Sequence, residues 1–118
     1  LVGWDNKKVA QNGAMAGELF ETFIVSEIVK SWINKGKDLR NLFFYRDSNQ
    51  KEIDLLIKKN DELYPIEIKM TGSPSVSMAK HFPVLKEVAQ IQNGTILCQC
   101  EKHLFLSDSI QVLPVDFI

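Results

Sequence analysis

The stretch from Glu52 to Met70 constrains this chain most, because two short apolar runs flank a polar break there. The runs are Ile53–Ile57 and Leu63–Ile68, and the break between them centres on Asn60-Asp61. Leucine-rich and β-branched runs that are separated by turn-forming residues are typical of a β-hairpin. The stretch therefore predicts two antiparallel strands joined by a two-residue loop.

The register of this predicted hairpin places two carboxylates opposite each other. A two-residue loop pairs Lys59 with Glu62, and counting outward from that pair brings Asp54 opposite Glu67. Strand alternation then puts both acids on one face of the sheet, together with Lys69. The other face carries four aliphatic side chains, those of Ile53, Leu55, Ile66 and Ile68.

Opposed carboxylates need a positive partner, because like charges directly across a strand pair are destabilising. Lys69 is one such partner, and a divalent cation is the other. An ordinary salt bridge with Lys69, worth about 0–1 kcal/mol at a surface, remains the plain structural alternative to a metal site.

An amphipathic helix is predicted over residues 15–34, with Gly36 as its stop signal. Glu21 falls inside the apolar stripe of this helix, where a carboxylate costs several kcal/mol unless it is paired or bound to a metal. Glu21 therefore needs a partner, although an acid in the first half of a helix is also favoured by the helix dipole. The stripe itself consists of Phe20, Ile24, Val25, Ile28 and Trp32.

The remaining elements complete an α/β fold in the order α-β-β-β-α-β, with a short β tail. They form a mixed central sheet with helices on both faces. A second helix is expected from Val76 to about Gln90, and Pro83 should kink it or split it in two. The other expected strands are Leu42–Arg46, a central strand Thr95–Cys100, and two edge strands, Leu104–Leu106 and Ile110–Leu113.

Length and composition indicate one domain, since 118 residues with 45% hydrophobic content can bury a substantial core. We assign the domain to residues 13–118 and interpret residues 1–12 as the tail of a preceding segment, with Gly13 and Gly17 as helix breakers. A first residue of Leu1 rather than Met suggests a piece of a longer protein. The formal net charge of −1 argues mildly against a stand-alone nucleic-acid binder.

Two further features of the sequence indicate the cellular compartment of the protein. The two cysteines, Cys98 and Cys100, are badly spaced for a disulfide, which favours a reducing compartment and hence the cytoplasm. No apolar run reaches membrane-spanning length, and no signal peptide is visible, so no membrane partner is expected.

Asp54, followed twelve residues later by Glu67-Ile68-Lys69 and preceded by Glu21 on a helix, resembles the PD-(D/E)XK nuclease superfamily. Ile53 stands where the superfamily name has proline. Within that superfamily, residues 13–118 look like the uncharacterised C-terminal domain of prokaryotic AAA+-type ATPases. The segments that carry this closer likeness are Gly17–Glu27, Phe44–Asp47, Glu52–Asp54 and Pro65–Lys69.

The resemblance implies a restriction-endonuclease-like core and a Mg²⁺ or Mn²⁺ site. Asp54, Glu67 and the backbone carbonyl of Ile68 would hold the cation, because such ions prefer oxygen ligands. Glu21 would bind a second cation or a water molecule. Lys69 would orient a metal-bound water and offset the charge that develops on the phosphate.

Arg46, at the end of the strand before the hairpin, would contact a phosphate; the alternative is an exposed strand end paired with Asp47. Two functions follow from the resemblance. The first is a metal-dependent phosphodiesterase that acts on DNA or RNA under an upstream ATPase domain of the same chain. The second is a catalytically silent nuclease-fold module that serves as an interaction or regulatory domain of that ATPase.

Overall fold

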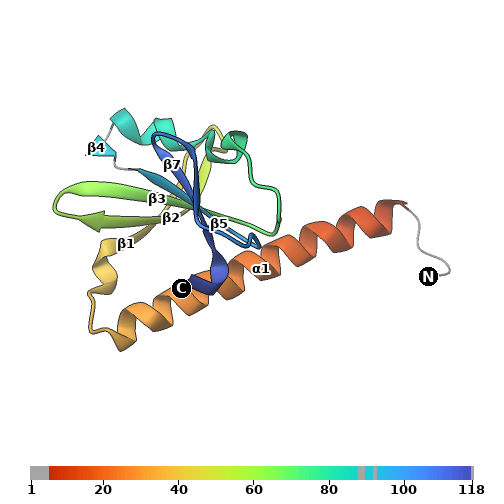
Figure 1. Ribbon diagram of the computed structural model, residues 1–118, viewed down its shortest axis with the longest axis horizontal. Helices are drawn as coiled ribbons and strands as arrows, with labels where there is room; N and C mark the ends of the chain where they lie inside the picture. The colour runs from red at the N-terminus through yellow and green to blue at the C-terminus, as the bar shows by residue number, and fades with distance from the viewer. Residues whose placement is uncertain (1–5, 88–89, 92, 118) are drawn as a thin grey trace.

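The computed structural model describes residues 6–87, 90–91 and 93–117. Within these ranges the chain forms one long α-helix, a seven-stranded sheet and four short 3-10 helices (Figure 1). In the same part of the chain, no helix combines the length and apolarity that crossing a membrane requires.

The sheet is mixed, and its main strand order is β1-β2-β3-β5-β7-β6, with β4 pairing beside β3. The first three strands are antiparallel, β3, β5 and β7 are parallel, and β6 runs antiparallel to β7. The predicted mixed α/β architecture is therefore confirmed, but β7 lies between β5 and β6 rather than at the edge. The strands are β1 (Leu42–Arg46), β2 (Glu52–Lys59), β3 (Glu62–Lys69), β4 (Gln90–Ile91), β5 (Gly94–Cys98), β6 (Leu104–Ser107) and β7 (Ile110–Pro114).

The β2–β3 hairpin has the predicted two-residue loop. Asn60 and Asp61 have φ angles of 54° and 64°, and positive φ at both positions matches the right-handed twist of the flanking strands. Pairing begins at Lys59↔Glu62 and continues without a shift to Leu55↔Ile66. The predicted register is confirmed over this range.

Pro65 is placed where β3 does not need its backbone N–H group. Counting outward from the hairpin loop, hydrogen-bonded residue pairs alternate with non-hydrogen-bonded pairs. Pro65 lies opposite Leu56 in a non-hydrogen-bonded pair, where a backbone N–H group would point away from β2. On that far side, β4 pairs only as far as Leu63, and the pairing with β5 begins at Ile66. Proline is thus tolerated inside a strand at the gap between two neighbours.

Helix α1 (Asn6–Asn34) is longer than the predicted helix. It continues through Gly13 and Gly17, so the prediction that these residues break it is wrong; an interior glycine costs only about 1 kcal/mol. The predicted stop is confirmed at Gly36, which has a φ of 70°. There Gly36 N–H bonds to the Ile33 carbonyl and Lys37 N–H to the Trp32 carbonyl, the pattern of a Schellman cap.

Helix α1 covers one face of the sheet with the predicted stripe. Ile24 and Ile28 are buried against Leu55, Ile68 and Leu97, one from each of β2, β3 and β5. Phe20 and Val25 pack at the border of the same cluster. Figure 1 shows the N-terminal part of α1 extending past the sheet.

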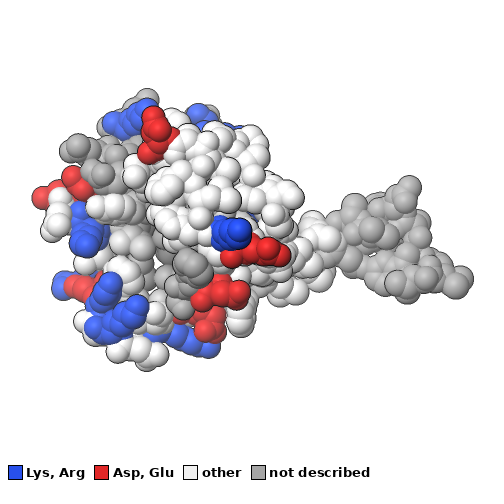
Figure 2. Space-filling model, in the orientation of Figure 1, with Lys and Arg blue, Asp and Glu red and all other residues white. Residues whose placement is uncertain are grey.

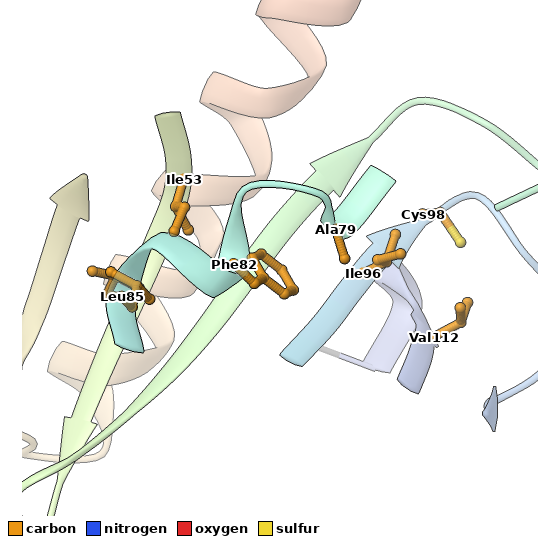
Figure 3. Close-up of a cluster of buried hydrophobic side chains, with 8 residues drawn as sticks. Ile53, Ala79, Phe82, Leu85, Ile96, Cys98 and Val112 are labelled. Atoms are coloured by element: carbon orange, nitrogen blue, oxygen red, sulfur yellow. The ribbon is translucent and has the colours of Figure 1, made fainter. Parts of the chain in front are cut away.

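The other face is covered by the 3-10 helices η2 (Val76–Ala79) and η3 (Phe82–Glu87) instead of the predicted second α-helix. The segment is split into two short helices as expected; the break falls at Lys80–His81, and Pro83, whose missing N–H group prevents a continuous α-helical ladder, is the second residue of η3. Figure 3 shows the buried cluster beneath these helices. It consists of Ile53, Leu56, Ala79, Phe82, Leu85, Ile96, Cys98 and Val112.

Candidate functional site

The site begins at an irregularity in β2. Phe43 pairs with Leu56 and Tyr45 pairs with Ile53, so three steps along β2 match two steps along β1. The extra residue lies at Asp54 or Leu55, which makes a β-bulge. Such bulges re-aim side chains and are frequent beside active sites.

Burial of the neighbouring side chains shows the same irregularity. Ile53 and Leu56 belong to the cluster beneath η2 and η3, whereas Leu55 belongs to the cluster beneath α1. The prediction that Ile53 and Leu55 share one face is therefore wrong. Strict alternation failed here because it does not allow for an extra residue.

Strands β2 and β3 part beyond Leu55↔Ile66, and side chains of the two predicted acids bridge the gap. The backbone N–H of Ile68 donates to Asp54 Oδ2 at 2.7 Å, and the N–H of Asp54 donates to Glu67 Oε1 at 3.3 Å. Backbone N–H groups in a strand point sideways, in the plane of the sheet. The Asp54 carboxylate thus lies between the strands.

Glu67 is a buried carboxylate, with 7% of its surface exposed. Its Oε2 lies 3.7 Å from Lys69 Nζ, and the lysine side chain is 45% exposed. The pKa of Glu67 is raised to about 7, first by burial and then by the charge of Asp54, while the charge of Lys69 partly opposes the rise. Glu67 therefore titrates near neutral pH.

Glu21 reaches the same place from α1. Its pKa is raised to about 7, first by burial and then by a side-chain hydrogen bond to Asp54 and by the charge of Asp54. A hydrogen bond between two carboxyl groups requires a proton on one of them, and the raised pKa assigns that proton to Glu21. The structure brings Glu21, Asp54, Glu67 and Lys69 together in one cluster.

The donor set has the chemistry of a site for Mg²⁺ or Mn²⁺, because it offers carboxylate oxygens and has one lysine against three acids. The present arrangement is not a preformed cage: among the described residues, no group of three or more His, Cys, Asp or Glu side chains is placed to hold a metal. Asp54 and Glu67 instead accept backbone hydrogen bonds. The metal-binding roles of Glu21, Asp54, Glu67 and the Ile68 carbonyl remain predictions.

Arg46 is paired, but not with the expected neighbour. Its guanidinium lies 2.9 Å from Glu52 Oε1 across the β1–β2 pair, and both side chains are more than half exposed. The alternative that paired Arg46 with Asp47 is wrong, because Asp47 accepts hydrogen bonds from Tyr45 and from the backbone of Asn49 and Lys51. The proposed phosphate contact of Arg46 remains a prediction.

His81 makes a contact with the backbone of Glu52 that could not be predicted from the sequence. Its Nδ1 lies 3.1 Å from the carbonyl oxygen of Glu52, so the turn between η2 and η3 is tied to the start of β2. In the sequence, no other residue at a spacing typical of metal ligands drew attention to this histidine.

Cys98 and Cys100 are free thiols. Cys98 belongs to the buried cluster beneath η2 and η3, and Cys100 packs against that cluster. Burial raises the pKa of Cys98 to about 12.

The surface of the molecule carries charges of both signs. Figure 2 shows lysine and arginine side chains interspersed with acidic ones on the face in view. This mixture agrees with the formal net charge of −1. A local charge pattern, rather than the net charge, must therefore decide any attraction for nucleic acid.

Comparison with known proteins gives a family but no activity. The model of a domain of unknown function (DUF4143) matches residues 16–118. Two curated relatives are uncharacterized proteins of Mycobacterium bovis (strain ATCC BAA-935 / AF2122/97) and Mycobacterium tuberculosis (strain ATCC 25618 / H37Rv). Each is 24% identical over 118 residues, which cover 100% of this chain and 25% of the relative. No solved structure gives a significant match.

Proposed function

Because the chain belongs to the DUF4143 family, a domain of unknown function, we propose from its site that it hydrolyses phosphodiester bonds of nucleic acid with Mg²⁺ or Mn²⁺. The observation that carries the proposal is the cluster of Glu21, Asp54, Glu67 and Lys69 at the point where β2 and β3 part. A restriction-endonuclease-like core of the PD-(D/E)XK type is part of the same proposal.

Each residue in the cluster has a role that its surroundings support. Asp54 and Glu67 would supply carboxylate oxygens to the cation. Glu21, with a pKa of about 7, can exchange protons close to neutral pH, where general acid–base groups work best. Lys69 can offset charge that develops on a phosphate oxygen. A bound divalent cation would polarise the phosphoryl group and lower the pKa of an attacking water.

The wider context of the domain is also a proposal. The chain spans about a quarter of the length of the mycobacterial relatives, so those proteins contain a larger part outside the matched region. We propose that an upstream ATPase domain of the AAA+ type occupies that part. Such a motor would present nucleic acid to the cluster or regulate its activity.

Thermal unfolding with and without Mn²⁺ tests the metal site. A cation that binds only the folded state stabilises it by about 2.7 kcal/mol at one hundred times its Kd, so millimolar Mn²⁺ should raise the Tm by several degrees. Asp54→Asn and Glu67→Gln should lose this rise. Glu101→Gln, at an exposed position, is the matched control and should keep it.

Hydrolysis is then measured on labelled DNA and RNA with the same variants. Cleavage that depends on Mn²⁺ and disappears in Asp54→Asn would support the proposal, whereas a Tm that does not change with millimolar Mn²⁺ would contradict it.

The second candidate function is a catalytically silent nuclease-fold module, which is favoured by the backbone hydrogen bonds that Asp54 and Glu67 already accept. It predicts neither a metal response nor cleavage.

A further inference from the structure

The first three residues of β2, Glu52–Asp54, carry one acid of the cluster but lie outside the backbone pairing with β3. That pairing ends at Leu55↔Ile66, and the pairing with β1 contains the bulge. Asp54 nevertheless accepts a hydrogen bond of 2.7 Å from the N–H of Ile68, which requires its carboxylate to stay between the strands. The position of this carboxylate therefore depends on the groups that fix the start of β2.

The side chains of Arg46 and His81 both hold Glu52, the first residue of β2. The ion pair between Arg46 and Glu52 joins two side chains that are more than half exposed, so it fixes the strand only weakly. His81 reaches the backbone instead: its Nδ1 lies 3.1 Å from the carbonyl oxygen of Glu52 and 3.4 Å from the backbone nitrogen. Nδ1 donates to the carbonyl in one tautomer and accepts from the N–H in the other, so either tautomer keeps a hydrogen bond to Glu52.

His81 is itself held in place by the packing of its neighbours in the chain. It lies in the turn between η2 and η3, and Ala79 and Phe82 on its two sides belong to the buried cluster beneath these helices. Ile53, which follows Glu52, belongs to the same cluster. One set of buried contacts thus fixes both partners of the hydrogen bond, which is the support that a precisely placed functional group needs.

We propose that His81 is a positioning residue for the acidic cluster of Glu21, Asp54, Glu67 and Lys69. By binding the backbone of Glu52, it fixes the start of β2 where β3 does not pair with it, and so keeps the Asp54 carboxylate between the strands. The inference rests on the proposed function, in which that carboxylate binds the cation. His81 acts through Asp54 and does not itself bind the metal.

Hydrogen exchange followed by NMR in EDTA tests this positioning without metal. His81→Ala should raise the exchange rates of the Asp54 and Ile68 amides about three- to tenfold, the effect of losing one hydrogen bond, while the amides of β5 keep the parent rates. His81→Asn, whose side-chain amide can reach the position of Nδ1, should restore both rates, and His81→Gln, which reaches the position of Nε2, should not. His103→Ala, at the other histidine, which contacts Gln111, is the matched control and should leave both rates unchanged.

The positioning role would be overturned by unchanged exchange at Asp54 and Ile68 in His81→Ala, by equal restoration in His81→Gln, or by rates that rise as much in β5. Mn²⁺ titration then separates this role from the proposed function. If the parent binds Mn²⁺, His81→Ala should bind it about tenfold more weakly and His81→Asn like the parent.

Two combined outcomes distinguish the failure of one inference from the failure of the other. A parent whose Tm does not change with Mn²⁺, but whose exchange rates respond to the His81 variants as expected, would reject the metal-dependent activity and support the positioning role. A metal response in the parent, with unchanged exchange and unchanged Mn²⁺ affinity in His81→Ala, would reject the positioning role alone.

Discussion

Two carboxyl groups of the acidic cluster bind and release protons near neutral pH. Glu21 and Glu67 have pKa values of about 7, raised from 4.5 mainly by burial, while the unfolded chain releases these protons near pH 4.5. Between those values the folded state binds more protons than the unfolded state, so its stability must fall as pH rises. Asp38 and Asp47 have lowered pKa values, and their contribution is lost only at lower pH.

We expect the free energy of unfolding, measured by urea denaturation in EDTA, to fall between pH 5 and pH 8. One pKa unit corresponds to about 1.4 kcal/mol, and solvent screening, which is stronger at the less buried Glu21 than at Glu67, reduces the effect to roughly 1–2 kcal/mol in total. The Glu21→Gln/Glu67→Gln variant should be nearly independent of pH in this window. Stability that rises with pH in the parent would contradict the arrangement of the cluster.

Among the elements, the β2–β3 hairpin depends on two consecutive residues with positive φ. Asn60 tolerates that conformation well, and Asp61 less so, because a Cβ crowds the backbone there. Asp61→Gly should therefore stabilise the protein by a few tenths to about 1 kcal/mol, since Asn-Gly is the preferred pair for this loop. The Lys58–Asp61 contact of 3.9 Å that it removes is exposed and worth little.

Asp61→Val is the opposing substitution and should destabilise the hairpin by about 1–2 kcal/mol, because a β-branched residue resists positive φ. Both changes are followed by urea denaturation. If Asp61→Gly destabilised the protein and Asp61→Val did not, the loop would be longer than two residues, and the register from Lys59↔Glu62 to Leu55↔Ile66 would be wrong.

At the scale of the whole molecule, the packing of η3 on the sheet depends on a glycine at the start of β5. A Cβ added at Gly94 would lie 2.3 Å from the Phe82 ring, so Gly94→Ala must displace a buried aromatic side chain. We expect a loss of about 1–3 kcal/mol in the free energy of unfolding.

Gly17→Ala is the matched control in α1. A Cβ at Gly17 meets nothing within 4 Å, so the substitution should stabilise the continuous helix by about 0.5–1 kcal/mol. Thermal or urea unfolding compares the two variants. A destabilising Gly17→Ala would mean that the helix is interrupted there, as the sequence alone had suggested.

Much of the fold could be predicted because its signals are local. The residues Asn60 and Asp61 determine the loop type and hence the register to Leu55↔Ile66, and the apolar stripe determines which face of α1 is buried. Gly36 ends the helix because it readily adopts positive φ. The same local geometry predicted Asp54 opposite Glu67, but the register ends at Leu55↔Ile66, and the two acids are joined instead by the hydrogen bond from the Asp54 N–H to Glu67 Oε1.

The sequence by itself thus determined the hairpin, the buried stripe and the identity of the four clustered residues. The tertiary structure decided the bulge in β2, the 3-10 form of η2 and η3, and the position of β7 inside the sheet. These features depend on contacts between segments far apart in the chain, such as the packing of Phe82 on Gly94. Local propensity carries no information about such contacts, and it therefore could not place Asp54 between two diverging strands.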